Sequence, residues 1–275
     1  MVVWLLITAS LGAQNKPTGN NILRKVLELQ MPLTAEDVNP GRRAGSVAWH
    51  PIFRKYYSNM CGNGDFPIAV FDEKGKRISQ DTCTTGVDMR GIWFNPFIKS
   101  LQGNGYDTVG LFSIVPKKNG QPVWPNVYRP GLNQPGPQCV GAYYREQDQI
   151  VYLSGRTIYF YGSASNQEER KLRLNWGRTK ADGMEDLMDE YEAAEAPEGY
   201  NITTVIFPGT KGAEIGVLNI TEGTIELYDK ASGFLSKKLK LPEGAPLEAN
   251  FNFSYANGIY WLFSMDERIW YGYKL

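Results

Sequence analysis

The sequence predicts an all-β protein built from internal repeats. Its 275 residues include 16 Tyr, 12 Phe and 7 Trp, which favour strands, and 29 Gly and 16 Pro, which favour turns. Several short segments alternate apolar and polar residues with a period of two, as in TIELY (224–228), which is the pattern of a half-buried strand. Long stretches with helical periodicity are rare. We therefore expect strands joined by tight turns.

A repeat of about 40 residues organises these strands. The segment WHPIFRK (49–55) recurs as WFNPFIK (93–99), and GNG (62–64) recurs as GNG (103–105). This alignment places Trp49 and Trp93 at matching positions, where we expect both to pack between repeats. Four short strands in each such unit are typical of a β-propeller blade. The chain resembles the β-propeller superfold from about residue 22 to 275, without the motifs of a named propeller family.

The pattern predicts five blades. The last unit supplies only three strands before residue 275, and the segment LRKVLELQMP (23–32) resembles the outer strand LSKKLKLP (235–242) of the preceding unit. We therefore expect the N-terminal strand to complete the last blade and remove a free sheet edge. The unassigned stretch 176–200 predicts one short amphipathic helical insertion, because apolar residues recur at helical spacing from Met184 to Tyr191. The predicted units span residues 45–79, 91–128, 139–174, 203–241 and 250–273.

The N-terminus and the cysteines bear on the compartment. Residues 1–13 form a short uncharged apolar run that is typical of a signal peptide, so we predict a secreted or periplasmic protein whose mature domain covers residues 14–275. A buried N-terminal strand is the alternative. In an oxidising compartment Cys61 and Cys83 are predicted to pair while Cys139 stays reduced. Three buried thiols are the alternative to that disulfide.

Composition excludes several classes of function. The 29 basic residues balance the 29 acidic ones, so no excess of positive charge favours nucleic acid. The chain has a single histidine, His50, which is too few for a multi-histidine metal site, and we interpret it as structural. Nucleotide and hydrolase motifs are absent, so no cofactor is predicted. No apolar run after the first 13 residues is long enough to span a membrane. We also expect the protein to be a monomer.

Function in propellers usually lies on loops around the central channel. On the face where outer strands lead to the next inner strand, Asp65, Asp88 and Asp107 are candidate catalytic carboxylates of a glycoside hydrolase. However, the predicted inner strands SVAWH, GIWFN, CVGAY, TTVIF and NFNFS contain no carboxylate, which counts against an enzyme. The same aspartates have a simpler interpretation as turn-capping residues.

The candidate binding residues lie near a Pro-rich loop on the same face. Trp124 and Tyr128 offer flat faces for sugar rings, and three polar side chains accompany them: Arg90, Arg129 and Gln138. We predict a secreted non-catalytic binding or scaffold module that recognises a carbohydrate or a protein on one propeller face. A glycoside hydrolase with paired carboxylates is the alternative.

Overall fold

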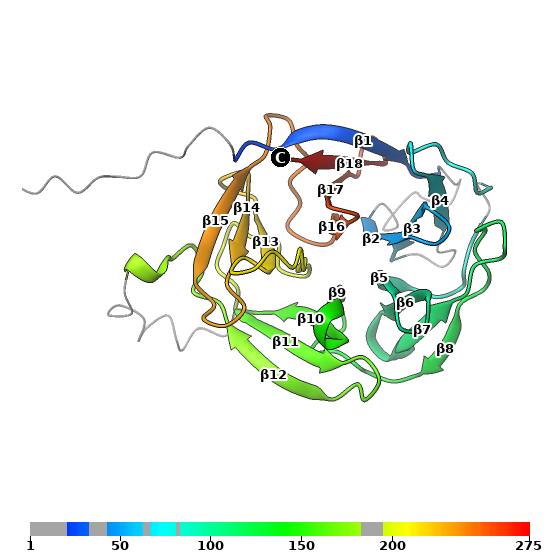
Figure 1. The fold of residues 1–275 in the computed structure, drawn as a ribbon, viewed down its shortest axis with the longest axis horizontal. Coiled ribbons are helices and arrows are strands. Elements are labelled where there is room, and N and C mark those ends of the chain that lie inside the picture. Colours follow the sequence, from blue (N-terminus) through cyan, green and yellow to red (C-terminus); the bar gives the residue numbers. More distant parts are fainter. Residues whose placement is uncertain (1–20, 33–42, 63–66, 81–82, 183–194) are drawn as a thin grey trace, which may run out of the picture.

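The computed structural model describes residues 21–32, 43–62, 67–80, 83–182 and 195–275. Five small antiparallel sheets surround a common axis, which confirms the five-bladed propeller (Figure 1). Short 3-10 turns span Asp107–Val109, Arg145–Gln147 and Lys180–Asp182. The strands are, in blade 1, β2 (Arg43–His50), β3 (Lys55–Cys61) and β4 (Ile68–Asp72); in blade 2, β5 (Met89–Asn95), β6 (Ser100–Gly105), β7 (Leu111–Ile114) and β8 (Asn126–Arg129); in blade 3, β9 (Ala142–Tyr144), β10 (Gln149–Ser154), β11 (Thr157–Gly162) and β12 (Glu168–Arg173); in blade 4, β13 (Ile215–Asn219), β14 (Thr224–Tyr228) and β15 (Leu235–Lys240); and in blade 5, β16 (Phe253–Ala256), β17 (Ile259–Ser264), β18 (Ile269–Lys274) and β1 (Arg24–Gln30).

Two expected strands are reduced to single bridges. In blade 1 the segment expected at 76–79 contacts β4 through a bridge between Phe71 and Arg77. In blade 4 the inner strand expected at 203–207 pairs with β13 through Ile206 and Gly216, which exchange backbone hydrogen bonds of 2.9 and 2.8 Å. Pro208 lies two residues after Ile206, at the next position that would bond β13, and it has no N–H to extend that ladder. Both segments nevertheless occupy their expected places in the blade.

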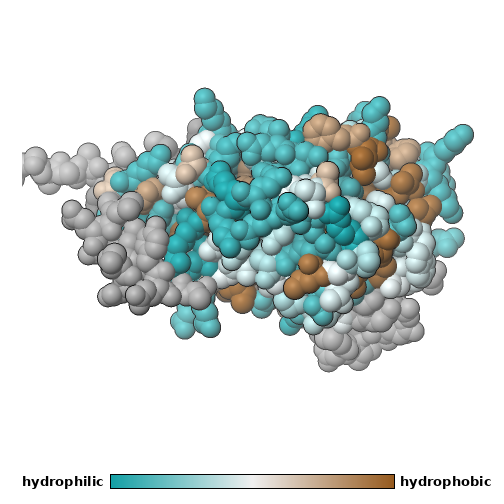
Figure 2. All heavy atoms as spheres, turned by 90° about the horizontal axis from the view of Figure 1, so that it is seen from below, coloured by the Kyte–Doolittle hydropathy of each residue, from teal (hydrophilic) through white to brown (hydrophobic). Residues whose placement is uncertain are grey.

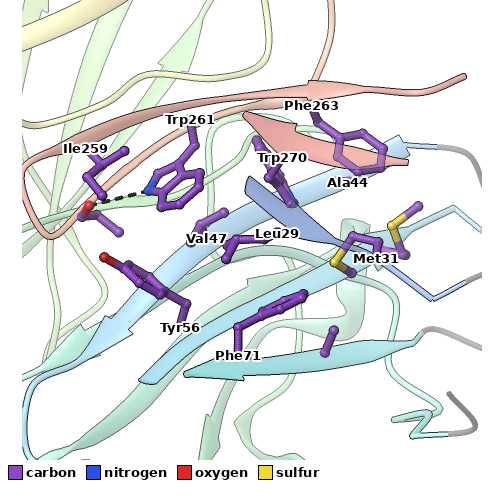
Figure 3. Close-up of a cluster of buried hydrophobic side chains, with 13 residues drawn as sticks. Leu29, Met31, Ala44, Val47, Tyr56, Phe71, Ile259, Trp261, Phe263 and Trp270 are labelled. Atoms are coloured by element: carbon purple, nitrogen blue, oxygen red, sulfur yellow. Dashed lines mark hydrogen bonds between the residues drawn. The ribbon is translucent and has the colours of Figure 1, made fainter. Parts of the chain in front are cut away.

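Strand β1 closes the ring, as the sequence predicts. It pairs antiparallel with β18, with Leu29 opposite Trp270, and thereby becomes the outermost strand of blade 5. The buried side chains of Leu29 and Met31 pack with Trp261, Trp270 and Phe263 in one cluster between blades 5 and 1 (Figure 3). The N-terminal strand therefore contributes to the core as well as to the sheet.

The register of blade 2 differs by one residue from the sequence alignment. Trp49 lies opposite Tyr56 at the end of β2, whereas the residue in the same place on β5 is Phe94, opposite Leu101. Because successive side chains of a strand point to opposite faces, Trp93 lies on the other face of its blade. The prediction that Trp49 and Trp93 match is therefore wrong. Trp93 does pack between blades as predicted, and only 5% of it is exposed.

Some predictions fall outside the described residues. The segment proposed as a signal peptide lies in residues 1–20, and most of the expected helical insertion lies in residues 183–194. In the described part of the expected insertion, the structure assigns only one helical turn, the 3-10 turn Lys180–Asp182. Among the described residues, no helix is long and apolar enough to cross a membrane.

The predicted disulfide is not formed, and all three cysteines are free thiols. Cys61 ends β3, whereas the carbonyl of Cys83 accepts a hydrogen bond of 2.9 Å from Ile68 on the far side of β4. Strand β4 thus lies between the two cysteines. Two strand spacings amount to about 10 Å, and a disulfide tolerates a Cα separation of about 7 Å at most.

Burial predicts that the three thiols differ in reactivity. Cys61 and Cys139 are buried, and burial raises the pKa of each thiol to about 12, so little reactive thiolate forms near neutral pH. Cys83 is only half-buried. We expect an alkylating reagent to modify Cys83 in the native protein and the other two only after unfolding, as mass spectrometry of peptides would show. Equal labelling of Cys61 and Cys83, or a cross-linked peptide containing both, would contradict the structure.

Candidate functional site

The central channel of the propeller contains a cavity of about 420 Å³. The inner segments of all five blades line it, and on β2 the lining runs from Ser46 to Trp49 and then to Pro51 in the following turn. The cavity therefore opens on the face that carries the turns from the first to the second strand of each blade. That face is opposite to the one that the sequence analysis favoured.

Each blade contributes one aromatic residue to the mouth of the cavity. All five are half-buried, and each ends or nearly ends the inner segment of its blade. Trp49 packs on Tyr56, and the other members also have aromatic or apolar neighbours that fix them. The mouth ring, as we call this set, consists of Trp49, Phe94, Tyr143, Phe207 and Tyr255.

The backbone of the mouth ring also faces the cavity. In an antiparallel strand, alternate residues direct both N–H and C=O to the same side. Ile206 exchanges both bonds with Gly216, so the groups of Phe207 point to the free edge. The backbone N–H and C=O of Val47 bond Ser254 of blade 5. The backbone groups of Trp49, two residues further along β2, therefore also point away from β3. Among the described residues, the backbone N–H groups of the mouth ring donate no hydrogen bond to another blade.

Below the mouth ring, side-chain hydroxyls join neighbouring blades. The Oγ of Ser46 accepts a hydrogen bond from the Ile92 N–H at 2.7 Å and donates to the Ile92 carbonyl at 3.3 Å. The Oγ of Ser254 does the same for Val47, at 3.0 and 3.2 Å. Asn104 accepts from the N–H groups of Gly91 and Gly141 at 3.1 and 3.0 Å. These bonds fix the width of the channel, because they leave the inner strands little freedom to separate.

Buried side chains lie at the end of the channel away from the mouth ring. Phe251 packs there with Cys61 and Val140 in a small buried cluster. The guanidinium groups of Arg90 and Arg43 lie over the Phe251 ring, at 5.3 and 5.7 Å from its centroid. The mouth ring, at the other end, is half-buried, and we expect a ligand to enter there.

The chemistry of the lining is narrow. All lining residues are among those described, and they include no Asp, Glu, His, Cys or Lys. The phenols of Tyr143 and Tyr255 stay neutral at ordinary pH, because burial raises the pKa of both. Arg145 is the one charged residue of the lining. The cavity thus offers aromatic faces, backbone hydrogen-bonding groups and one positive charge.

The turns that follow β2 and β5 add apolar surface on the same face. Ile52, Phe97 and Ile98 are 59%, 65% and 52% exposed. The edge-on view in Figure 2 shows a mainly hydrophilic surface on which hydrophobic residues gather toward the right. The mouth of the cavity is therefore flanked by apolar turns on blades 1 and 2.

The structure brings three of the predicted site residues together on the opposite face. Arg90 forms an ion pair with Asp88, including a contact of 3.1 Å between Nη2 and Oδ2, and its Nε donates to the Gln138 Oε1 at 3.2 Å. Asp88 also accepts a hydrogen bond of 3.1 Å from the Gly62 N–H. Arg90 is only 4% exposed. These contacts lie at the end of the channel away from the mouth ring, and the paired Asp88 is not a free carboxylate.

The remaining predicted residues are dispersed. Arg129 donates to the carbonyls of Ala164 and Ser165 at 2.8 and 2.6 Å, and the Tyr128 hydroxyl accepts from the Gln102 Nε2 at 3.1 Å. Both are thereby bonded within or between blades. Trp124 is 66% exposed and does not line the cavity. Asp107 lies in the 3-10 turn after β6, away from the cavity lining, and Asp65 lies outside the described residues.

One pair of carboxylates does interact on that face. The pKa of Glu248 is raised, first by burial and then by the negative charge of Asp266, although Arg43 opposes the shift. A carboxyl group with a raised pKa beside a second carboxylate is a pattern found in acid–base sites. Neither residue was selected from the sequence, because their proximity depends on how the two loops fold.

Comparisons with known proteins support the fold alone. No family model and no curated protein matches the sequence. Among solved structures, glutaminyl cyclase from Myxococcus xanthus is similar over 92% of this chain and 96% of its own, with a TM-score of 0.55 and 8% identity. A chain of a nidogen–laminin complex (TM-score 0.41, 13% identity, 72% of this chain and 63% of that one) and a chain of a mitotic checkpoint complex (0.45, 10%, 100% and 98%) are less similar.

Proposed function

We propose that this protein is a non-catalytic binding module that holds a saccharide unit in the central cavity. The observation that carries the proposal is the mouth ring, which combines aromatic side chains with backbone groups that lack partners on other blades. Sugar rings present C–H faces that pack on aromatic surfaces and hydroxyls that both donate and accept hydrogen bonds. The mouth ring offers partners for both features.

A protein partner is a weaker fit for the cavity itself. A cavity of about 420 Å³ suits a small molecule or a single projecting residue, whereas protein interfaces bury broad surfaces. The exposed apolar turns beside the mouth, which include Ile52 and Phe97, favour a larger ligand that also contacts the rim. A terminal sugar of a longer glycan meets both conditions. The export predicted from residues 1–13 is kept as part of this proposal, because an exported protein would meet the glycans of cell surfaces.

A glycoside hydrolase remains the second candidate. It would use Glu248 and Asp266 on the opposite face, because the cavity lining supplies no carboxylate pair. The similar fold of a glutaminyl cyclase means that this scaffold can carry an enzyme, but 8% identity transfers no residue. The two candidates therefore depend on different faces of the molecule and can be separated by mutation.

Glycan binding tests the first candidate. We expect Trp49→Ala to weaken retention on a glycan array about tenfold or more, since loss of one stacking face costs about 1.4 kcal/mol. Trp124→Ala is the matched control, because this exposed tryptophan lies away from the cavity, and its retention should equal that of the wild type. Melting temperatures of both variants show whether the fold is kept, and Tyr255→Ala repeats the test from another blade.

The outcomes separate the candidates. Unchanged retention in folded Trp49→Ala and Tyr255→Ala would reject the cavity as the binding site. Turnover of aryl glycosides by the wild type that is lost in Glu248→Gln would favour the hydrolase instead. Retention that is lost in Trp124→Ala alone would return the site to the Pro-rich loop of the opposite face.

A further inference from the structure

Arg145 stands out among the residues around the cavity. It begins the 3-10 turn that follows β9, and it lines the cavity beside Tyr143 of the mouth ring. The residues in the same place after β2 and β5 are Pro51 and Pro96, which carry no charge. Only blade 3 therefore brings a cation to the cavity, and it does so from a turn whose backbone is fixed by its own hydrogen bond.

The nearby carboxylates are bonded elsewhere. Glu146 approaches Lys230 at 3.9 Å and accepts a hydrogen bond of 3.3 Å from the Tyr144 hydroxyl. Asp148 accepts from the hydroxyls of Tyr143 and Ser163. Both acids thus have partners, and no carboxylate among the described residues pairs with Arg145. The guanidinium is exposed and free to meet a ligand.

From these observations we propose that the cavity selects an acidic saccharide, whose carboxylate or sulfate group is bound by Arg145. This inference rests on the proposed function, since it names the ligand class of the same cavity. A guanidinium binds a carboxylate or sulfate with two parallel hydrogen bonds, which favours arginine over lysine at such a position. The aromatic faces and backbone groups of the mouth ring hold the sugar, and Arg145 recognises its charge.

The proposal predicts a charge preference that one residue controls. Matched pairs of immobilised glycans that end in glucuronic acid or glucose, and in galacturonic acid or galactose, are the probes. Hydrogen bonds to a charged group are stronger than those between neutral groups, so we expect the wild type to bind the acidic member about 10- to 100-fold more tightly. The preference should shrink when salt is raised from about 0.05 M to about 0.5 M.

Arg145→Gln should remove this preference, because the substitution removes the positive charge from the cavity. Arg145→Lys should retain part of the preference. Arg54→Gln is the matched control, since Arg54 is a surface arginine that is paired with Glu73 and does not line the cavity.

Equal affinity of the wild type for acidic and neutral members would overturn this inference but not the proposed function. A preference that persists in Arg145→Gln would also overturn it. If neither member binds, the inference and the proposed function both fail. A preference lost equally in Arg54→Gln and Arg145→Gln would assign the effect to general surface charge and reject the specific role of Arg145.

Discussion

Removal of residues 1–31 is expected to leave a chain that does not fold at ordinary temperature. The truncation deletes β1, which carries Leu29, and also Leu23 and Met31, all of them almost fully buried. Loss of one such side chain typically costs about 2–5 kcal/mol, and the net stability of a domain is about 5–15 kcal/mol. The unpaired edge of β18 adds a tendency to aggregate.

Two point variants keep this prediction quantitative. Leu29→Ala is expected to lower the free energy of unfolding by about 3 kcal/mol, because Leu29 packs against Trp261 and Trp270 in the cluster of Figure 3. Val26→Ala lies on the same strand but is 51% exposed, so its effect should stay within about 0.5 kcal/mol. Urea unfolding measures both. Equal effects of the two substitutions, or a truncated chain that unfolds like the full one, would show that β1 does not hold the ring.

Acidification should destabilise the protein through His50, its only histidine. The side chain is 1% exposed among Phe53, Tyr57 and Phe94, and burial lowers its pKa to about 4 from the ordinary 6.5. Between about pH 6.5 and 4, His50 binds a proton in the unfolded chain but stays neutral in the folded one. Stability is therefore complete above about pH 6.5 and falls by about 3 kcal/mol as the pH approaches 4.

The chain itself supplies the control for His50. Asn95 occupies the same place at the end of β5, where its Oδ1 accepts a hydrogen bond of 2.9 Å from the Phe97 N–H; the Nδ1 of His50 accepts from the Phe53 N–H at 3.4 Å. His50→Asn should keep a turn-capping acceptor and remove the titration. Between about pH 6.5 and 4 the variant should lose about 3 kcal/mol less stability than the wild type. Parallel pH profiles of unfolding free energy would refute the role of His50.

The sequence predicted the architecture because the blades repeat their strand and turn chemistry. Leucine alternation in 23–32 and in 235–242 was sufficient to place β1 in the last blade. The register was less accessible: the turns after β2 and β5 both have four residues, yet the matching tryptophans at 49 and 93 favoured an alignment shifted by one. In a strand, that shift exchanges the two faces of the sheet, so Trp93 and Phe94 exchanged roles.

The candidate site was predicted only in part. The inner segments were recognised as free of carboxylates, and this property now defines the cavity. The mouth ring was missed, since Tyr143, Phe207 and Tyr255 gain a common position only once the register of all five blades is fixed. The cysteines show the same limit: a spacing of 22 residues in the sequence does not reveal that β4 separates Cys61 from Cys83. With the correct register, the sequence alone would show an aromatic residue at the same position of all five inner segments, and this would have predicted the mouth ring.

The pairing of β1 with β18 also governs the order in which the fold can be completed. Residues that lie opposite each other in this pair, such as Leu29 and Trp270, are far apart in the sequence. Among the strands, β1 is therefore synthesised first, but it can pair only after β18 has been made. Contacts between such distant segments slow folding, although the entropy of closing a long loop grows only logarithmically with its length. Until β18 emerges, β1 remains without its sheet, and the apolar side chain of Leu29 without its neighbours. The time spent in that open state, rather than the stability of the finished ring, sets the exposure of the nascent chain to misassociation.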